Sequence, residues 1–286
     1  MNGSARIVQR ESEAGFVVAA SCAPDPRLAP FVEGIYRGFA QCGTQPSVMR
    51  ETPVPKIPIV FNLGALWHLT SETDGRRIAD SFLSGLDEHY TLVESARDIS
   101  CLQVDFTPLG ALRLLNRPLC EIANRVVALE DVLGHDGEVL LARLREAAWD
   151  DRFALLDAFF LRRFAASEAG SGELAWAWRK LRSHHGQIAI GAMAGELGWS
   201  HKRLIGSFRR DFGLTPRRAG RVMRFARAVR LLRAGDAARR ADLALDCGYY
   251  DQAHLNRDFR DFAGVTPSEF LRGLLPDPVA AAAPAR

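Results

Sequence analysis

The pattern of apolar and polar positions in the last third of the chain predicts pairs of short helices. An apolar face at helical spacing is formed by Met193, Ala194 and Leu197. It ends at Gly198, which suits the positive φ of a tight turn. A second helix is predicted between Ser200, a good N-cap residue, and Gly213. Its inward-facing residues are Leu204, Phe208 and Phe212. Two short helices joined by a turn with Gly predict a helix-turn-helix.

The same plan returns in a second stretch, so the unit is duplicated. Residues 208–216 read FRRDFGLTP and residues 259–267 read FRDFAGVTP. In the second copy the first apolar face consists of Leu243, Ala244 and Cys247, and the turn contains Gly248. The inward residues of its second helix are Leu255, Phe259 and Phe262. The repeat therefore predicts two helix-turn-helix units.

Residues 215–236, between the two units, predict one long helix. Pro216 suits its first turn and Gly235 its far end. The predicted core-facing stripe is Ala219, Val222, Ala226 and Val229. Arginines surround it at positions 217, 218, 221, 224, 227, 230 and 233. A helix of about 18 residues is roughly 27 Å long, so it could hold two recognition helices about one DNA turn, roughly 34 Å, apart.

The N-terminal half has a different pattern. Short apolar stretches separated by turn residues predict strands at 57–64, 66–70, 80–86, 88–94 and 99–108. Such a series indicates a small antiparallel barrel or sandwich. Helical patterns follow at 109–115, 120–133, 138–149 and 152–164. The last two have apolar faces that would pack on the barrel or on a second subunit, formed by Val139, Leu140 and Leu144 and by Phe153, Leu156 and Phe160. Small residues at 165–172 predict a linker.

Charge separates the two halves. From Ser171 to the end there are 20 Lys and Arg against 11 Asp and Glu, a net charge of +9. The first 170 residues hold 17 against 23, a net charge of −6. This asymmetry indicates that the C-terminal half meets a polyanion, although a solvated charged face would also explain it. No apolar run reaches the roughly 18–20 residues of a membrane span, and the N-terminus lacks the apolar core of a signal peptide, so we expect a cytoplasmic protein without a membrane partner.

Metal and catalytic chemistry have little support in the sequence. The five cysteines have no CxxC pair and are expected to be reduced and mostly buried: Cys22, Cys42, Cys101, Cys120 and Cys247. The single histidines at 68, 89 and 135 are scattered, and His184 and His185 are adjacent, which does not suit one metal. No nucleophile elbow, P-loop or dinucleotide-binding glycine motif occurs. We expect no catalytic residue, no metal and no cofactor, with a cupin-type metal enzyme fused to a DNA-binding domain as the alternative.

The duplicated units resemble the AraC/XylS family of transcriptional regulators. The stretch GYYDQAHLNRDFRDFAGVTPSEF contains the family's Gly-aromatic pair, Asp-Gln, His, Arg, Phe-basic pair and Gly-x-Thr-Pro ending. The resemblance covers about residues 173–273 and implies an all-α DNA-binding domain (173–275), whose two helix-turn-helix motifs are joined by a long helix. For residues 1–166 it implies a cupin-like antiparallel β-barrel with helices that binds a small-molecule effector and forms a homodimer. The fold class is thus α+β, and 276–286 would be a flexible tail.

The same resemblance implies a sequence-specific regulator that binds double-stranded promoter or operator DNA and can contact RNA polymerase. A regulator whose N-terminal half only dimerises is the alternative within this class. The residues expected to meet DNA lie on the outward faces of the two recognition helices: His201, Lys202, Arg203, Ser207, Arg209, Gln252, His254, Asn256 and Arg257. Gln252 matches a base-contact position of the family, and Gln and Asn can pair with adenine edges. Asp251 is expected to cap its helix, and His254 either reads DNA or packs.

Overall fold

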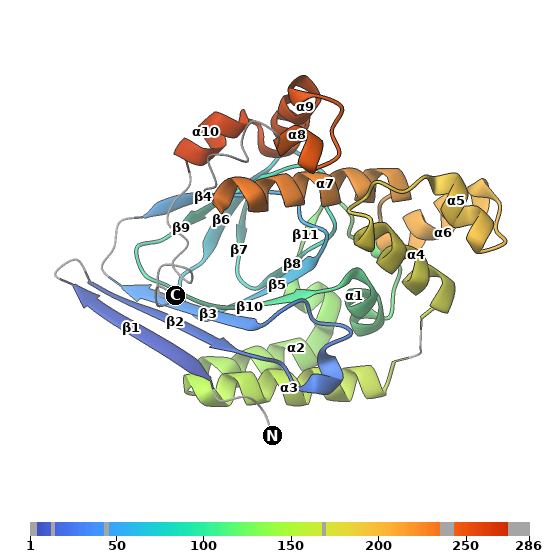
Figure 1. The fold of residues 1–286 in the computed structure, drawn as a ribbon. Coiled ribbons are helices and arrows are strands. Elements are labelled where there is room, and N and C mark those ends of the chain that lie inside the picture. The colour runs from blue at the N-terminus through green and yellow to red at the C-terminus, as the bar shows by residue number, and fades with distance from the viewer. Residues whose placement is uncertain (1–4, 13–14, 43–45, 168–169, 235–242, 274–286) are drawn as a thin grey trace.

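The computed structural model describes residues 5–12, 15–42, 46–167, 170–234 and 243–273. Its N-terminal half combines antiparallel strands with helices, and its C-terminal half is helical (Figure 1). The larger sheet has seven strands in the spatial order β1 (Arg6–Ser12), β2 (Gly15–Cys22), β3 (Tyr36–Cys42), β10 (Ile99–Phe106), β5 (Ile57–Asn62), β8 (Phe82–Ser84) and β11 (Val126–Ala128). The smaller sheet has the order β4 (Ser47–Glu51), β9 (Thr91–Ser95), β6 (Trp67–Ser71) and β7 (Gly75–Ala79). The predicted α+β class is confirmed. In the described part of the chain the two sheets do not close into one ring, so the cupin-like barrel is open.

The seven-stranded sheet separates two apolar clusters because its side chains alternate between its faces. On β10, Leu102, Val104 and Phe106 belong to the main core, whereas Ile99 and Cys101 pack with the cluster between the two sheets. Helices α2 (Leu129–Glu146) and α3 (Trp149–Ala165) cover the face of the sheet that belongs to the main core (Figure 1). The ring of Phe160 on α3 meets that of Phe106 edge-on, with 4.9 Å between their centroids. The remaining elements of this half are η1 (Pro26–Leu28), α1 (Pro108–Leu115) and η2 (Leu119–Glu121).

Several N-terminal predictions need correction. The helix expected at 120–133 is wrong over its first part, because Asn124 adopts a left-handed φ of 56° and Val126–Ala128 pairs with β8 before α2 begins. The strand expected at 88–94 begins only at Thr91. Strands β1 to β4, β7 and β11 were not predicted. Val139 is 44% exposed and does not join the core, unlike its five predicted companions on α2 and α3.

The five cysteines are less buried than expected. Only Cys22 and Cys247 are buried, whereas Cys120 is exposed.

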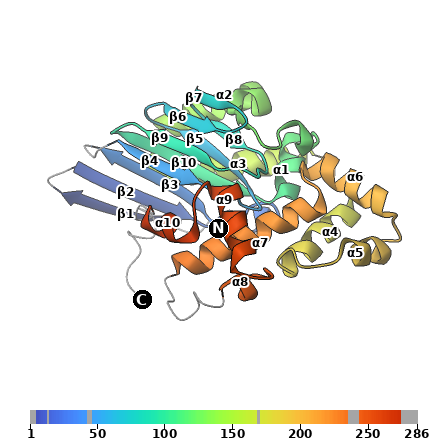
Figure 2. The ribbon, with the colours of Figure 1, turned by 90° about the horizontal axis from the view of Figure 1, so that it is seen from above.

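The helical half follows the predicted plan closely. Its elements are α4 (Gly172–Ser183), α5 (Ile190–Glu196), α6 (His201–Phe212), α7 (Pro216–Arg233), α8 (Leu243–Asp246), α9 (Gln252–Ala263) and α10 (Pro267–Arg272). Figure 2 shows α7 running between α4–α6 and α8–α9. Helices α5 and α6 form the first helix-turn-helix unit, and α8 and α9 form the second. The predicted helix end at Gly235 and the tail 276–286 lie outside the described residues.

Turns and caps explain where the two units begin and end. Gly198 and Gly248 have φ values of 65° and 77° in the two turns, and Gly213 and Gly264 end α6 and α9 in the left-handed conformation. The Ser200 hydroxyl accepts a hydrogen bond from the backbone N–H of Arg203 at 3.2 Å, as an N-cap does.

The core stripe of α7 is wider than predicted. Ala219, Val222 and Val229 are buried, while Ala226 is only partly covered. Phe225 is also buried, and its ring centroid lies 4.9 Å from that of Phe259 on α9. Among the described helices, none combines the length and the apolar character needed to cross a bilayer.

Candidate nucleic-acid interface

The recognition helix of the first unit, α6, is anchored by Leu204, Phe208 and Phe212, all fully buried. Most of its predicted contact residues lie on the exposed face: His201, Lys202, Arg203 and Arg209. Ser207 is half-buried. The Arg203 guanidinium stacks on the Trp199 ring, 4.2 Å from its centroid. In this structure, the side chain is therefore already in contact with the protein. On the same exposed face of α6, Ile205 and Gly206 form an open stretch without polar side chains.

The recognition helix of the second unit, α9, carries an ordered polar pair at its N-terminal end. The side-chain amide of Gln252 donates a hydrogen bond to the Asn256 Oδ1 atom at 3.2 Å. Gln252 and Arg257 are exposed, and Asn256 is half-buried. Since residues four apart lie on one face of a helix, the pair holds two amide groups side by side. Either amide can donate and accept a hydrogen bond, as an adenine edge requires.

Two side chains near this pair, Asp251 and His254, make contacts within the protein. The Asp251 Oδ1 atom accepts from the backbone N–H of His254 at 2.7 Å, so Asp251 caps α9 as expected. The His254 ring packs edge-on against Tyr249, with 5.2 Å between the ring centroids. The ring of His254 is thus packed on the protein, and its contact with DNA stays a prediction.

A buried ion pair between α7 and α9 was not predicted. Asp258 on α9 is 1% exposed, and its Oδ1 atom accepts from the Arg221 guanidinium on α7 at 2.9 and 2.7 Å. The same guanidinium reaches Asp261 at 2.5 Å and lies over the Phe262 ring. The sequence did contain a signal, because Asp258 stands three residues after Leu255 and beside Phe259, on the inward side of the helix.

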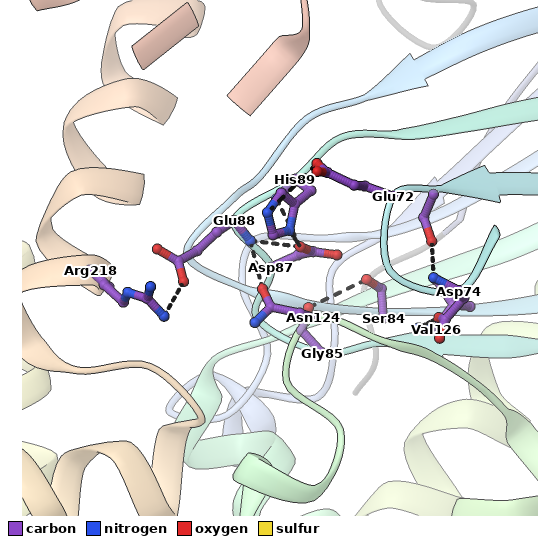
Figure 3. Close-up of polar contacts among 11 residues, drawn as sticks. Glu72, Asp74, Ser84, Gly85, Asp87, Glu88, His89, Asn124, Val126 and Arg218 are labelled. Atoms are coloured by element: carbon purple, nitrogen blue, oxygen red, sulfur yellow. Dashed lines mark hydrogen bonds and ion pairs between the residues drawn. The ribbon is translucent and has the colours of Figure 1, made fainter. Parts of the chain in front are cut away.

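Other arginines of α7 also bind protein rather than standing free around the helix. Arg224 donates to the Gly186 carbonyl oxygen at 2.9 Å. Arg218 forms an ion pair with Glu88 of the N-terminal half at 3.0 Å (Figure 3). Three of the seven arginines predicted to surround α7 therefore join elements together, and the charge left for a polyanion is smaller than the sequence count.

Figure 3 shows how the N-terminal half meets α7 through the loop between β8 and β9. The backbone N–H of Glu88 donates to Asn124 Oδ1 at 2.9 Å, which ties this loop to the one after η2. Burial raises the pKa of the Glu88 carboxyl, and Arg218 acts in the opposite direction. Next to it, the Tyr90 ring packs on Gly264, where an added Cβ would lie 2.6 Å from the ring. The end of α9 is thus in contact with the N-terminal half.

The histidines do not converge. His89 Nδ1 lies 3.3 Å from Asp87, and its Nε2 lies 3.8 Å from Glu72 (Figure 3). In the described ranges, no group of three or more His, Cys, Asp or Glu side chains is arranged to hold a metal ion.

Comparisons with known proteins agree with this architecture. Residues 193–273 match a family model described as a helix-turn-helix domain, and residues 20–128 match one described as a domain of unknown function (DUF6597). No curated protein matches the chain in sequence.

Solved structures are similar to this chain at low sequence identity. An apo variant of ToxT from Vibrio cholerae is 11% identical, with a TM-score of 0.50 over 88% of this chain and 100% of that chain. ToxT bound to an unsaturated fatty acid is 14% identical, with a TM-score of 0.46 over 80% of this chain and 95% of that one. The AraC-like transcriptional activator CuxR is 14% identical, with a TM-score of 0.31 over 80% of this chain and 86% of that one. The duplicated units, their caps and the matched family together identify residues 193–273 as a DNA-binding helix-turn-helix domain, and the chain is similar to transcription regulators of the AraC/XylS family.

Proposed function

We propose that α6 and α9 enter neighbouring major grooves of operator DNA and that α9 reads bases directly. The observation that carries this proposal is the Gln252–Asn256 pair, which is held by its own hydrogen bond on the face opposite the buried Leu255 and Phe259. A preordered pair loses less side-chain entropy on binding a base edge. Arg257 is the neighbouring residue that contacts phosphate, or a guanine.

On the first unit, the proposed contacts are mostly to phosphate. Lys202, Arg203 and Arg209 are exposed cations on α6, with His201 and Ser207 beside them. The open stretch at Ile205 and Gly206 offers a methyl-sized apolar contact and close backbone approach rather than hydrogen bonds. His254, packed on Tyr249, is proposed only as a contact at the edge of the second site.

Binding to genomic fragments tests this function. The full chain is mixed with sheared genomic DNA, and retained fragments are sequenced at about 50 mM and about 200 mM salt, a range over which counterion release weakens binding steeply. We expect a small set of sites that share a two-part motif. Retention of fragments without any shared motif at either salt concentration would contradict sequence-specific binding.

We propose that residues 1–166 bind the effector and form the homodimer, whereas residues 173–275 bind DNA. We also propose that the protein acts on promoters in the cytoplasm. Fragment 173–286 should retain DNA under the conditions above. Sedimentation of fragment 1–166 should show a homodimer; the exposed Val139 on α2 supports an outer apolar contact. Contact with RNA polymerase is proposed from the family alone, and transcription from a bound promoter in purified components tests it.

The cluster between the two sheets is proposed as the effector site. Its buried members include Trp67, Leu69 and Phe82, and the indole N–H of Trp67 is buried without a hydrogen-bond partner among the described residues. A buried donor without an acceptor is costly, so a ligand with an apolar body and one acceptor oxygen would fit there. A thermal-shift screen should find such ligands, and Trp67→Phe should abolish the shift that they cause. Equal shifts in the variant would place the effector elsewhere.

A further inference from the structure

The two helix-turn-helix units touch each other beside α7, at the turn between α4 and α5. This turn contains His185 and Gly186, both with positive φ, 50° and 76°. Gly186 lies against Gly220 of α7 so closely that a Cβ on Gly186 would overlap the Gly220 carbonyl oxygen. A Cβ on Gly220 would lie 2.9 Å from the Gly186 oxygen. Backbone therefore meets backbone, which leaves this contact little freedom to slide.

Arg224 links this turn to the second unit. Its guanidinium donates to the Gly186 oxygen at 2.9 Å and stands over the Tyr249 ring, 5.9 Å from the centroid. Tyr249 is 2% exposed and stands in the turn between α8 and α9, two residues before the cap of α9. One side chain of the linking helix thus contacts the entry to the first unit and the turn of the second.

Gln187 makes the contact between the units direct. Its side-chain amide lies against Gly248, where a Cβ would overlap it. Gly248 is the turn glycine of the second unit, and Gln187 stands only three residues before Ile190, the first residue of α5 in the first unit. We call the set Gly186, Gln187, Gly220, Arg224, Gly248 and Tyr249 the unit junction.

We propose that the unit junction fixes the separation and orientation of α6 and α9, and thereby makes the spacing between the two half-sites of an operator a determinant of specificity. This inference rests on the proposed function, because it concerns the DNA that both units bind. Each base pair inserted between half-sites adds about 3.4 Å and turns the second site by about 34°. A protein whose two units are rigidly joined cannot follow that change without losing contacts in one groove. If α7 alone joined the units, they could tilt relative to each other and keep their contacts in both grooves.

The experiment measures spacing preference in the full chain. An operator selected by the wild-type protein is synthesised with the central spacer unchanged, lengthened by one base pair and shortened by one base pair. The readout is the ratio of the Kd for an altered spacer to the Kd for the original. Arg224→Met and Gln187→Ala are compared with wild type, and Arg230→Met, an exposed residue of the same helix, is the matched control. Because the two Kd values in each ratio come from the same variant, a general loss of stability or of phosphate attraction cancels.

We expect wild type and Arg230→Met to lose about tenfold or more for either altered spacer, comparable to the loss of a base contact. Arg224→Met and Gln187→Ala should lose about threefold or less while selecting the same bases in each half-site. Identical steep ratios in all four proteins would overturn the role of the unit junction. A flat ratio in wild type would also overturn it, since the units would then not be held at one spacing. A wild-type protein that selects no two-part site would instead refute the proposed function.

Discussion

Arg221 on α7 holds the buried carboxylate of Asp258 on α9 by two hydrogen bonds of 2.9 and 2.7 Å. Removing one partner leaves a buried charge without compensation. Since the Arg221 side chain is 32% exposed, we expect Arg221→Met to cost about 2–3 kcal/mol in the free energy of unfolding, at or below the low end for a fully buried pair. Urea unfolding followed by circular dichroism measures this.

Arg217→Met is the control for that experiment, because Arg217 is exposed on the same helix. The double variant Arg221→Met with Asp258→Asn should regain part of the loss, since it no longer buries a lone charge. Equal costs for Arg217→Met and Arg221→Met would contradict the assigned role of the pair.

Gln252 and Arg209 are expected to act on different properties of DNA binding. Gln252→Ala should relax the preference at one base pair, about 1–3 kcal/mol of discrimination, with little change in the salt slope. Arg209→Ala should weaken binding to all sequences and lower the slope by about one unit. Binding-site selection with each variant separates the two, and an unchanged preference with Gln252→Ala would rule out direct reading by this residue.

Loss of the Asp251 cap of α9 should lower stability by a smaller amount, and Asp251→Ser serves as the control. Asp251→Ala removes the acceptor for the His254 N–H and should cost about 1 kcal/mol of stability, whereas Asp251→Ser should retain most of it. Thermal unfolding of both variants checks this. A loss of base preference with Asp251→Ser at full stability would show that the carboxylate also contacts DNA.

Glu88 gives the contact between the two halves a dependence on pH. Because burial raises its pKa, the folded chain binds this proton more tightly than the unfolded chain does. Its contribution to stability is therefore present below the ordinary carboxyl pKa and is lost as pH rises through the raised value. We expect Glu88→Gln to have a higher Tm than wild type at pH 8, with a difference that shrinks as the pH is lowered toward 4. A difference that grows on acidification would reverse this sign and show that the ion pair with Arg218 outweighs burial.

The helical half was predictable because local signals decide it. The Gly-containing turns, the Ser200 and Asp251 caps and the inward Leu and Phe positions are all set by spacing within a few residues, and the structure confirms them. The contact residues on α6 and α9 lie on the faces that the same spacing assigns to them, and their contact with DNA stays a prediction.

What could not be predicted depends on partners far away in the chain. The residues 126–128 form a strand only because β8 lies beside them, which no local pattern reveals. Likewise, an Arg every three or four residues along α7 reads as a basic surface, but Glu88, Gly186 and Asp258 decide which of these guanidinium groups are already occupied. The close approach of Gly186 to Gly220 joins positions that have no pattern in common.

Chemical footprinting on a selected operator tests the central claim most directly. Hydroxyl-radical cleavage and guanine methylation interference are recorded for the full chain bound to its own site. The account predicts two protected major-groove segments on one face of the duplex, about one helical turn of 10–10.5 base pairs apart, with Gln252→Ala altering only one of them. Protection of a single segment, or uniform protection without any base whose methylation interferes, would contradict a regulator that reads DNA through two helix-turn-helix units.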